Sequence, residues 1–302
     1  MDELCFEITE ELEEERIDKC LAALVDSLSR SFIQKLIREE QVQVNGRPVK
    51  GSYRVKAEDR VVFSLPKAME PEILPEHIPL DILYEDEDVI VVNKPKGMVV
   101  HPAAGHSGGT LVNALLGHCG SSLSGINGVL RPGIVHRIDM DTTGSIVACK
   151  NDRAHNCIAE QLREHSITRK YHALCQGNLK EDAGTIDRPV GRHPVDRKKM
   201  AVNEKNGKRA VTHYRVLERF GKYTYIECRL ETGRTHQIRV HMASLGHPLL
   251  GDLLYGAQKG PFRLQGQALH AKVLGFRHPS TGEYLEVDAP LPEYFLRLIS
   301  QV

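Results

Sequence analysis

The pattern of hydrophobic and polar positions over residues 16–65 predicts a small domain that begins with two helices. Apolar residues recur at helical spacing over residues 17–25. Ser29 is a favourable N-cap for a second helix, which we expect to end near Glu40. One arc of this second helix is apolar and the opposite arc is polar and mostly basic. The apolar arc comprises Phe32, Ile33, Leu36 and Ile37, and the polar arc comprises Arg30, Gln34, Lys35 and Arg38.

A β-hairpin is predicted directly after these helices. Residues 42–44 alternate between valine and glutamine, and the Asn45-Gly46 dipeptide that follows is a strong turn signal. Apolar residues alternate again over 61–65, which predicts a closing strand. The basic arc and the hairpin together resemble a platform for phosphates, although an amphipathic surface helix would look partly the same. The candidate RNA contacts are Arg30, Lys35, Arg38 and Arg47.

The longer second part of the chain mixes strand-like and helix-like patterns. Thr110 is an N-cap for a helix through Leu116, and Asn151 or Asp152 is an N-cap for another helix through about Glu164. Strand-like runs occupy residues 89–93, 133–138, 145–149, 169–175 and 223–230. Because these elements lack the strict βαβ alternation of a doubly wound sheet, we expect an α+β fold.

Composition excludes several classes of protein. The chain has 302 residues, 41% hydrophobic and 26% charged, which is typical of a soluble protein with about two domains. Its apolar runs are too short to span a bilayer, and its first fifteen residues carry eight acidic groups and no basic one, unlike a signal peptide. Seven cysteines without a C-x-x-C pair suit a reducing cytosol. We therefore expect a cytoplasmic protein without a membrane segment.

Charge and proline divide the chain into four segments. The formal net charge of zero combines −8 over residues 1–15, +5 over 16–67, −8 over 68–93 and +11 over the remainder. The basic regions favour a polyanionic partner, and we expect the acidic segments to be loosely structured. Four prolines between positions 66 and 79 indicate a linker. The expected organisation is an acidic segment (1–15), a small domain (16–65), a linker (66–80) and a large domain (81–302).

Asp139 is the first candidate for chemistry in the large domain. It follows a predicted apolar strand, and Arg137 precedes it closely. An aspartate near an arginine is ionised at neutral pH, which suits a nucleophile or a base rather than a general acid. The alternative is a structural ion pair. We interpret the nearby Asp141 as the start of an Asx turn.

Two further segments carry candidate residues. Tyr171 is either a core tyrosine of its predicted strand or a ring on which a nucleobase stacks. Arg234 precedes Thr235, the expected N-cap of a helix, in a place that favours anions, unless it is an ordinary surface arginine. His236 and His241 are about 140° apart on a helix, which is poor geometry for a shared metal ion.

The string H-R-I-D-M-D-T-T-G at residues 136–144 resembles the signature of the RluA-type pseudouridine synthases. The resemblance continues through residues 94–97, 101–102, 170–174, 233–241 and 251–256. Residues 29–38 and 41–50 similarly resemble the S4 RNA-binding module. Together these motifs cover nearly the whole chain and look closest to the RluD-like branch, although Ile138 replaces the usual leucine and Thr143 the usual serine.

The resemblance implies a fold, a reaction and a set of roles. The fold is a mixed, mainly antiparallel central sheet with flanking helices, preceded by an S4-like helix–helix–hairpin domain. The reaction is the conversion of uridine to pseudouridine in large-subunit (23S) ribosomal RNA, with a flipped-out base and without cofactor or metal. By matching position, Asp139 is the catalytic aspartate, Arg234 is the arginine that pairs with it, and Tyr171 packs against the uracil. Arg137 contacts RNA near the site.

Three other functions stay open at this point. The chain is alternatively a non-catalytic RNA-binding or ribosome-assembly protein, or a synthase that acts on transfer RNA. A metal-dependent hydrolase that uses His236 and His241 is the third alternative. Our main expectation is a monomeric enzyme whose partner is large-subunit ribosomal RNA.

Overall fold

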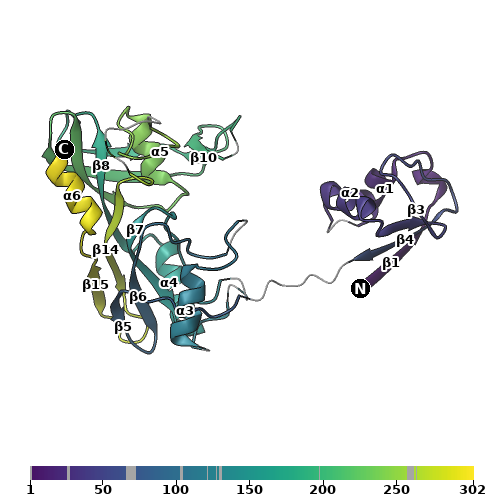
Figure 1. Cartoon of the computed structure of the whole chain (residues 1–302), viewed down its shortest axis with the longest axis horizontal. Helices are drawn as coiled ribbons and strands as arrows, with labels where there is room; N and C mark the ends of the chain where they lie inside the picture. Colours follow the sequence, from purple (N-terminus) through teal and green to yellow (C-terminus); the bar gives the residue numbers. More distant parts are fainter. Residues whose placement is uncertain are drawn as a thin grey trace. The chain divides into compact units, whose positions relative to one another are not determined.

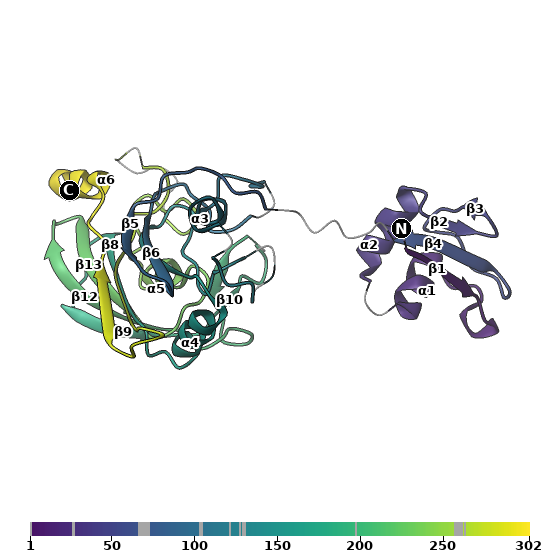
Figure 2. The same ribbon diagram turned by 90° about the horizontal axis from the view of Figure 1, so that it is seen from below.

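The computed structural model folds into two compact units, Met1–Glu70 and Pro71–Val302, which are described separately (Figure 1, Figure 2). The structure describes residues 2–25, 28–65, 73–102, 105–120, 122–126, 128, 131–196, 198–256, 262 and 264–302. Within these ranges no helix has the length and apolar character that crossing a bilayer requires.

The first unit is a four-stranded sheet with two helices. Its elements are β1 (Asp2–Glu7), a 3-10 turn (Glu10–Leu12), α1 (Ile17–Leu24), α2 (Arg30–Arg38), β2 (Val42–Val44), β3 (Arg47–Pro48) and β4 (Arg60–Leu65), and the strand order is β1-β4-β2-β3. Ser29 caps α2 by accepting a hydrogen bond from the backbone N–H of Phe32. The predicted helix–helix–hairpin arrangement is therefore confirmed.

The acidic N-terminal segment is not loosely structured, which corrects the expectation for residues 1–15. β1 pairs with β4 in antiparallel register along its full length. Leu4 and Phe6 alternate within the acidic run and pack against the core of this unit, where the Phe6 ring stacks on Phe63 at 5.9 Å. Two apolar side chains on one face are therefore enough to recruit an otherwise charged strand.

The second unit is built on a nine-stranded mixed sheet. The strand order is β5-β6-β7-β14-β8-β13-β12-β9, and β15 also pairs with β14. Only β7 and β14 are parallel among the pairs described; the others are antiparallel. The strands are β5 (Ile82–Glu85), β6 (Val89–Lys94), β7 (Thr143–Cys149), β8 (Thr168–Gln176), β9 (Ala183–Asp187), β12 (Val211–Arg219), β13 (Tyr223–Leu230), β14 (Leu269–Arg277) and β15 (Tyr284–Asp288). The expected α+β class and mixed sheet are confirmed.

Helices cover both faces of this sheet. They are α3 (Leu111–Cys119), α4 (Asp152–Arg163), α5 (Gln237–Ser244) and α6 (Glu293–Gln301), and a separate hairpin comprises β10 (Val190–Arg192) and β11 (Met200–Val202). Ile90 and Val92 of β6 share a core with α3 and α5, whereas Val89 and Val91 share a core with α4. Figure 2 accordingly shows α3 and α4 on opposite sides of β5 and β6. α6 packs on Leu174, which faces away from the α5 side.

Most predicted boundaries agree with the structure, and two do not. Thr110 caps α3 in a capping box with Asn113, and Asn151 caps α4. The predicted strand over 133–138 forms only a single bridge, Ile134 with Ala148. The N-cap residue of α5 is His236 rather than the predicted Thr235, and the helix begins at Gln237.

The predicted linker falls only partly within the described residues, because 66–72 lie outside them. Its second half is docked on α3. The backbone N–H of Glu76 donates to the carbonyl of Asn113 (3.0 Å), and the Asn113 amide donates to the carbonyl of Leu74 (2.8 Å). A Cβ at Gly117 would lie 2.2 Å from the Glu76 carbonyl oxygen, so this glycine permits the contact. The large unit thus begins before residue 81.

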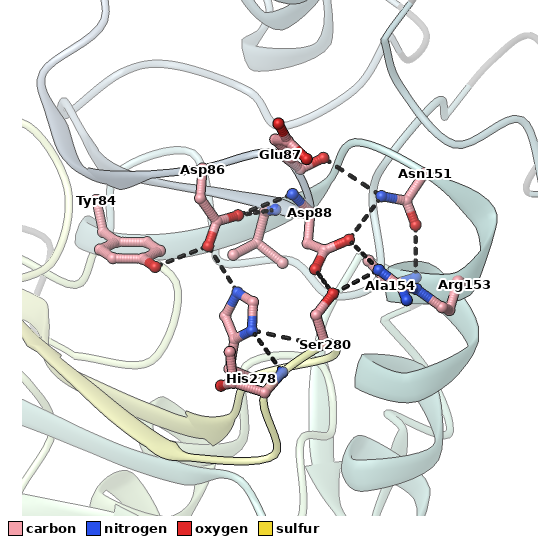
Figure 3. A network of polar contacts seen from close by, with 11 residues as sticks. Tyr84, Asp86, Glu87, Asp88, Asn151, Arg153, Ala154, His278 and Ser280 are labelled. Carbon is pink, nitrogen blue, oxygen red and sulfur yellow. Dashed lines mark hydrogen bonds and ion pairs between the residues drawn. The ribbon is translucent and has the colours of Figure 1, made fainter.

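A polar cluster joins the β5–β6 turn, the start of α4 and the β14–β15 turn (Figure 3). The Asp88 carboxylate accepts hydrogen bonds from Asn151 (2.8 Å), Arg153 (3.0 Å) and the Ser280 hydroxyl. Asp86 pairs with His278 at 2.6 Å on the neighbouring side. The bonds from Ser280, Asn151 and Arg153 lower the pKa of Asp88 to about 2. The cluster anchors the first turn of α4, whose opposite end reaches the site described next.

Candidate active site

A pocket of about 540 Å³ lies where three of the chemically loaded segments meet. The loop before β7, the start of β8 and the segment leading into α5 all contribute to its wall. Arg137, Asp139, Tyr171 and Arg234 all line it. The four residues that the resemblance assigned to the site of the large domain are therefore brought to one cavity.

A buried lysine, Lys94, bonds the loop that carries Asp139 to the turn over residues 94–97. The ammonium group of Lys94 donates to the carbonyls of Pro95 (2.8 Å), Met98 (2.8 Å) and Met140 (2.9 Å). The Gly97 N–H also donates to the Met140 carbonyl, at 3.0 Å. Lys94 is completely buried, and burial lowers its pKa to about 7. The residues of the 94–97 turn thus position the residue that follows Asp139.

Asp139 forms its ion pair with Arg239. The Arg239 Nη1 donates to Oδ2 of Asp139 at 2.9 Å, while its Nε and Nη2 donate to the two carboxylate oxygens of Asp252 at 2.7 and 2.9 Å. Asp252 is fully buried, whereas the Asp139 side chain is 19% exposed. Burial opposes the charge of Arg239, but both carboxylates outweigh it and raise the pKa of Arg239. The Asp139 carboxylate is therefore accessible from the pocket, and its orientation is fixed by Arg239.

The expected ion pair between Asp139 and Arg234 is wrong. The Arg234 Nε donates to the carbonyl of Arg209 at 3.0 Å, and its backbone N–H donates to the Gln237 side chain. Because α5 begins at Gln237, Arg239 lies in its first turn and reaches Asp139, while Arg234 lies before the helix. Arg234 still lines the pocket.

Tyr171 lies on β8 between Cys228 of β13 and Ala271 of β14. It belongs to the core cluster on the α5 side, as the core interpretation expects. It also lines the pocket, and its stacking against a nucleobase stays a prediction. It is 8% exposed, and burial raises the pKa of its hydroxyl. The ring is thus a neutral, rigid surface beside Asp139.

The histidines suggested for a metal make unrelated contacts. The His236 Nδ1 bonds the hydroxyl of Tyr255 at 2.8 Å, while His241 bonds Thr212 and the carbonyl of Arg188, both at 2.9 Å. The metal-hydrolase alternative therefore has no shared site at these two residues. Elsewhere in the described part of the chain, Glu85, His118 and Cys119 place potential ligand atoms within 4.8 Å of one another, and Lys150 occupies one Glu85 oxygen at 2.9 Å.

The four candidate RNA contacts of the first unit are all exposed. Arg30 also has a structural bond, because its guanidinium donates to the buried carboxylate of Asp18 at 2.9 Å. Burial opposes the charge of Asp18, but donors from Arg16, Gln34 and Arg30 hold its pKa well below the usual range. Arg30 therefore joins α1 to α2 whether or not RNA is present.

Comparisons with known proteins identify the family of this chain. The family model for RNA pseudouridylate synthases matches residues 88–244, and the S4 domain model matches residues 15–61. The uncharacterized RNA pseudouridine synthase YlyB of Bacillus subtilis is 53% identical over 302 residues, which is 100% of this chain and 99% of the relative. A ribosomal large subunit pseudouridine synthase D of Zymomonas mobilis is 48% identical over 95% of this chain and 93% of its own.

The fold is similar to that of the human protein called RNA pseudouridylate synthase domain containing 1. That structure superposes with a TM-score of 0.58 and 28% identity, covering 72% of this chain and 85% of the human one. The fold and the pocket thus define an RNA-modifying enzyme. The chain belongs to the RNA pseudouridylate synthase family and is an RNA pseudouridine synthase with an S4 domain.

Proposed function

We propose that this enzyme isomerises uridines of large-subunit ribosomal RNA to pseudouridine, with Asp139 as the reacting side chain. The observation that carries the proposal is the Asp139–Arg239–Asp252 arrangement, which presents one carboxylate to a pocket beside Tyr171. The RNA class is supported by relatives named ribosomal large subunit pseudouridine synthase D, which are 43–48% identical to this chain.

The reaction breaks the bond between C1′ of the ribose and N1 of uracil and joins C1′ to C5. The proton lost from C5 is balanced by one gained at N1, so the overall reaction is an isomerisation. A carboxylate held in place by Arg239 can act on the sugar or the base as a nucleophile or a base. Because the reacting bond is inaccessible in a stacked helix, the uridine must leave the stack to enter the pocket.

Binding energy for this extrusion comes from basic surfaces on both units. The first unit offers Lys35, Arg38 and Arg47, all exposed. Within residues 188–209 of the second unit the sequence holds eight Lys or Arg and two acidic residues. This segment carries the β10–β11 hairpin, which is tied to the pocket wall because the Met200 N–H donates to the hydroxyl of Tyr255, the partner of His236. Phosphate contacts of this kind are electrostatic and independent of sequence.

The test compares pseudouridine maps of total RNA from cells that lack this protein, with and without wild-type or Asp139→Asn protein. We expect specific large-subunit positions to lose the modification and to regain it only with the wild type. Loss confined to transfer RNA would contradict the ribosomal substrate. Full rescue by Asp139→Asn would remove Asp139 from its role, and unchanged maps in the deletion strain would contradict the proposed function.

A further inference from the structure

Arg169 is a buried cation without a carboxylate partner. It is 7% exposed, its Nη2 donates to the carbonyl of Glu231 at 3.0 Å, and its buried Nε has no hydrogen-bond partner. Among the described residues, no acidic side chain lies within ion-pair distance of Arg169, in contrast to Arg239 with two. Burial accordingly lowers the pKa of Arg169. Burying a charge without an opposite charge beside it costs free energy of folding, so we infer that the hydrogen-bond donors of Arg169 serve a function.

Arg169 lines the pocket. Arg169 precedes Tyr171 by two residues on β8, so both side chains project from the same face of the strand, and both line the cavity. A Cβ at Gly233 would lie 2.6 Å from Nη1, so this glycine leaves the space that the guanidinium occupies. β8 thus carries this guanidinium, and the segment with Gly233 leaves room for it.

Tyr171, Arg169 and Asp139 all line the pocket, and Arg169 and Asp139 make no ion pair with each other. If the proposed function holds, the ribose of the target lies at Asp139 and its base lies against Tyr171. The base then extends away from Asp139, and the atom farthest from its bond to the sugar is C4. In uracil C4 carries a carbonyl oxygen, whereas in cytosine it carries an amino group.

We propose that Arg169 donates a hydrogen bond to O4 of the target uracil and so selects uridine over cytidine. This inference rests on the proposed function and adds a specificity-determining residue to it. The bond supplies an acceptor for a guanidinium whose Nε has no hydrogen-bond partner, whereas cytosine would place a donor against a donor. When the C1′–N1 bond breaks with its electron pair on the ring, negative charge spreads to O4. The same electron pair then forms the C1′–C5 bond.

The first experiment changes the substrate and leaves the wild-type protein intact. Synthetic stem–loops around a mapped target carry uridine, 2-thiouridine or 4-thiouridine at that position, and single-turnover rates are measured by nucleoside mass spectrometry. Sulfur is a weaker acceptor than oxygen, so we expect 4-thiouridine to react roughly tenfold more slowly or worse, and 2-thiouridine to stay within a few-fold of uridine. Equal rates for the 4-thio and unmodified RNA would overturn the inference.

The second experiment asks whether Arg169 and O4 act as a pair. Arg169→Met should slow the reaction with uridine and erase the difference between uridine and 4-thiouridine, while Arg169→Lys should restore part of that difference. Arg277→Met, which removes an exposed arginine outside the pocket wall, is the matched control. A purely structural role for Arg169 would lower all rates and leave the uridine to 4-thiouridine ratio intact, which would also overturn the inference.

The outcomes separate this inference from the function on which it rests. Absence of pseudouridine in the unmodified stem–loop, with wild-type protein that binds it, would contradict the proposed substrate. Normal activity on uridine together with no sensitivity to the 4-thio substitution would contradict only the role of Arg169. Should Arg169→Met melt below the assay temperature, the wild-type series with the two thiouridines still decides.

Discussion

The guanidinium of Arg239 binds two different carboxylates. The Nε and Nη2 edge is held by Asp252, and the remaining Nη1 holds Asp139. Because Asp252 also accepts the backbone N–H groups of Leu254 and Tyr255, it is fixed by its own turn. The direction of the Asp139 carboxylate is thus determined by a chain of three side chains, of which Asp139 and Arg239 line the pocket and Asp252 is buried behind them.

Replacement of Arg239 should therefore harm both catalysis and stability. We expect Arg239→Met to lower kcat at least 100-fold and to lower Tm. The Tm falls because removing one partner of a buried ion pair lowers the free energy of unfolding by about 3–5 kcal/mol. Arg234→Met is the matched control: its loss removes a bond to the Arg209 carbonyl and leaves the Asp139 pair in place, so we expect a smaller effect, mainly on KM. Rate measurements on ribosomal RNA with thermal melts of both variants test this, and a larger kcat loss for Arg234→Met would contradict it.

The sequence predicted that Asp139 and Tyr171 share a site, and both line the pocket, but it did not predict that Arg239 pairs with Asp139. Arg234 and Arg239 lie five positions apart and both line the pocket, so the start of α5 decides which one reaches Asp139. That start depends on the buried side chain of Gln237, which bonds Thr232, the Arg234 N–H and β12. The β12 partner, the Val211 carbonyl, lies far away in the sequence, and no local pattern could reveal that contact.

Elements with local signals were predictable, whereas elements defined by distant pairing were not. Ser29, Thr110 and Asn151 all act as the predicted N-caps, because a cap bonds within its own first turn. The segment 133–138 has the apolar composition of a strand, yet it makes a single bridge, Ile134 with Ala148, and the Val147 N–H donates to the His136 ring rather than to a backbone carbonyl. β14 pairs with β7 only at Thr143 and Gly144. That pairing depends on Gly144, where a Cβ would lie 2.3 Å from the Ala271 carbonyl oxygen.

At the level of α4, the polar cluster of Figure 3 should contribute stability that depends on pH. The pKa of Asp88 is about 2 in the folded protein, below the ~3.9 of an unfolded aspartate, so the unfolded chain takes up the proton first as the pH falls. The stabilisation is full near neutral pH and is lost between roughly pH 5 and pH 2. We expect Asp88→Asn to lower Tm by roughly 4–8 °C at pH 7 and by much less near pH 3.

Thermal melts at the two pH values test this prediction. Asp182→Asn removes a carboxylate that is 88% exposed in its ion pair with Arg219, and we expect it to leave Tm nearly unchanged at both values. An Asp88→Asn variant with the same Tm deficit at both pH values would show that the loss arises from packing rather than from the ionised carboxylate.

At the scale of the whole molecule, the second unit holds the pocket, and exposed basic residues lie on both units. In the proposed function catalysis depends on groups inside the second unit, whereas the S4 domain contributes exposed charges that do not line the pocket. Such a division predicts that RNA affinity and chemical rate respond to different substitutions. Arg30 is unsuitable for a test because its bond to Asp18 supports the S4 fold itself.

Reversal of the other three charges, Lys35→Glu, Arg38→Glu and Arg47→Glu, in the full chain should therefore raise KM for ribosomal RNA at least tenfold and leave the single-turnover rate at saturating RNA unchanged. Each lost phosphate contact also removes about 0.7–0.9 from the slope of log affinity against log salt, so the slope should flatten by about 2–3. A triple reversal of Lys222, Arg277 and Arg297, exposed residues outside the pocket wall, is the control and should change the slope much less. An unchanged slope in the S4 variant would assign RNA docking to the second unit and its basic segment 188–209.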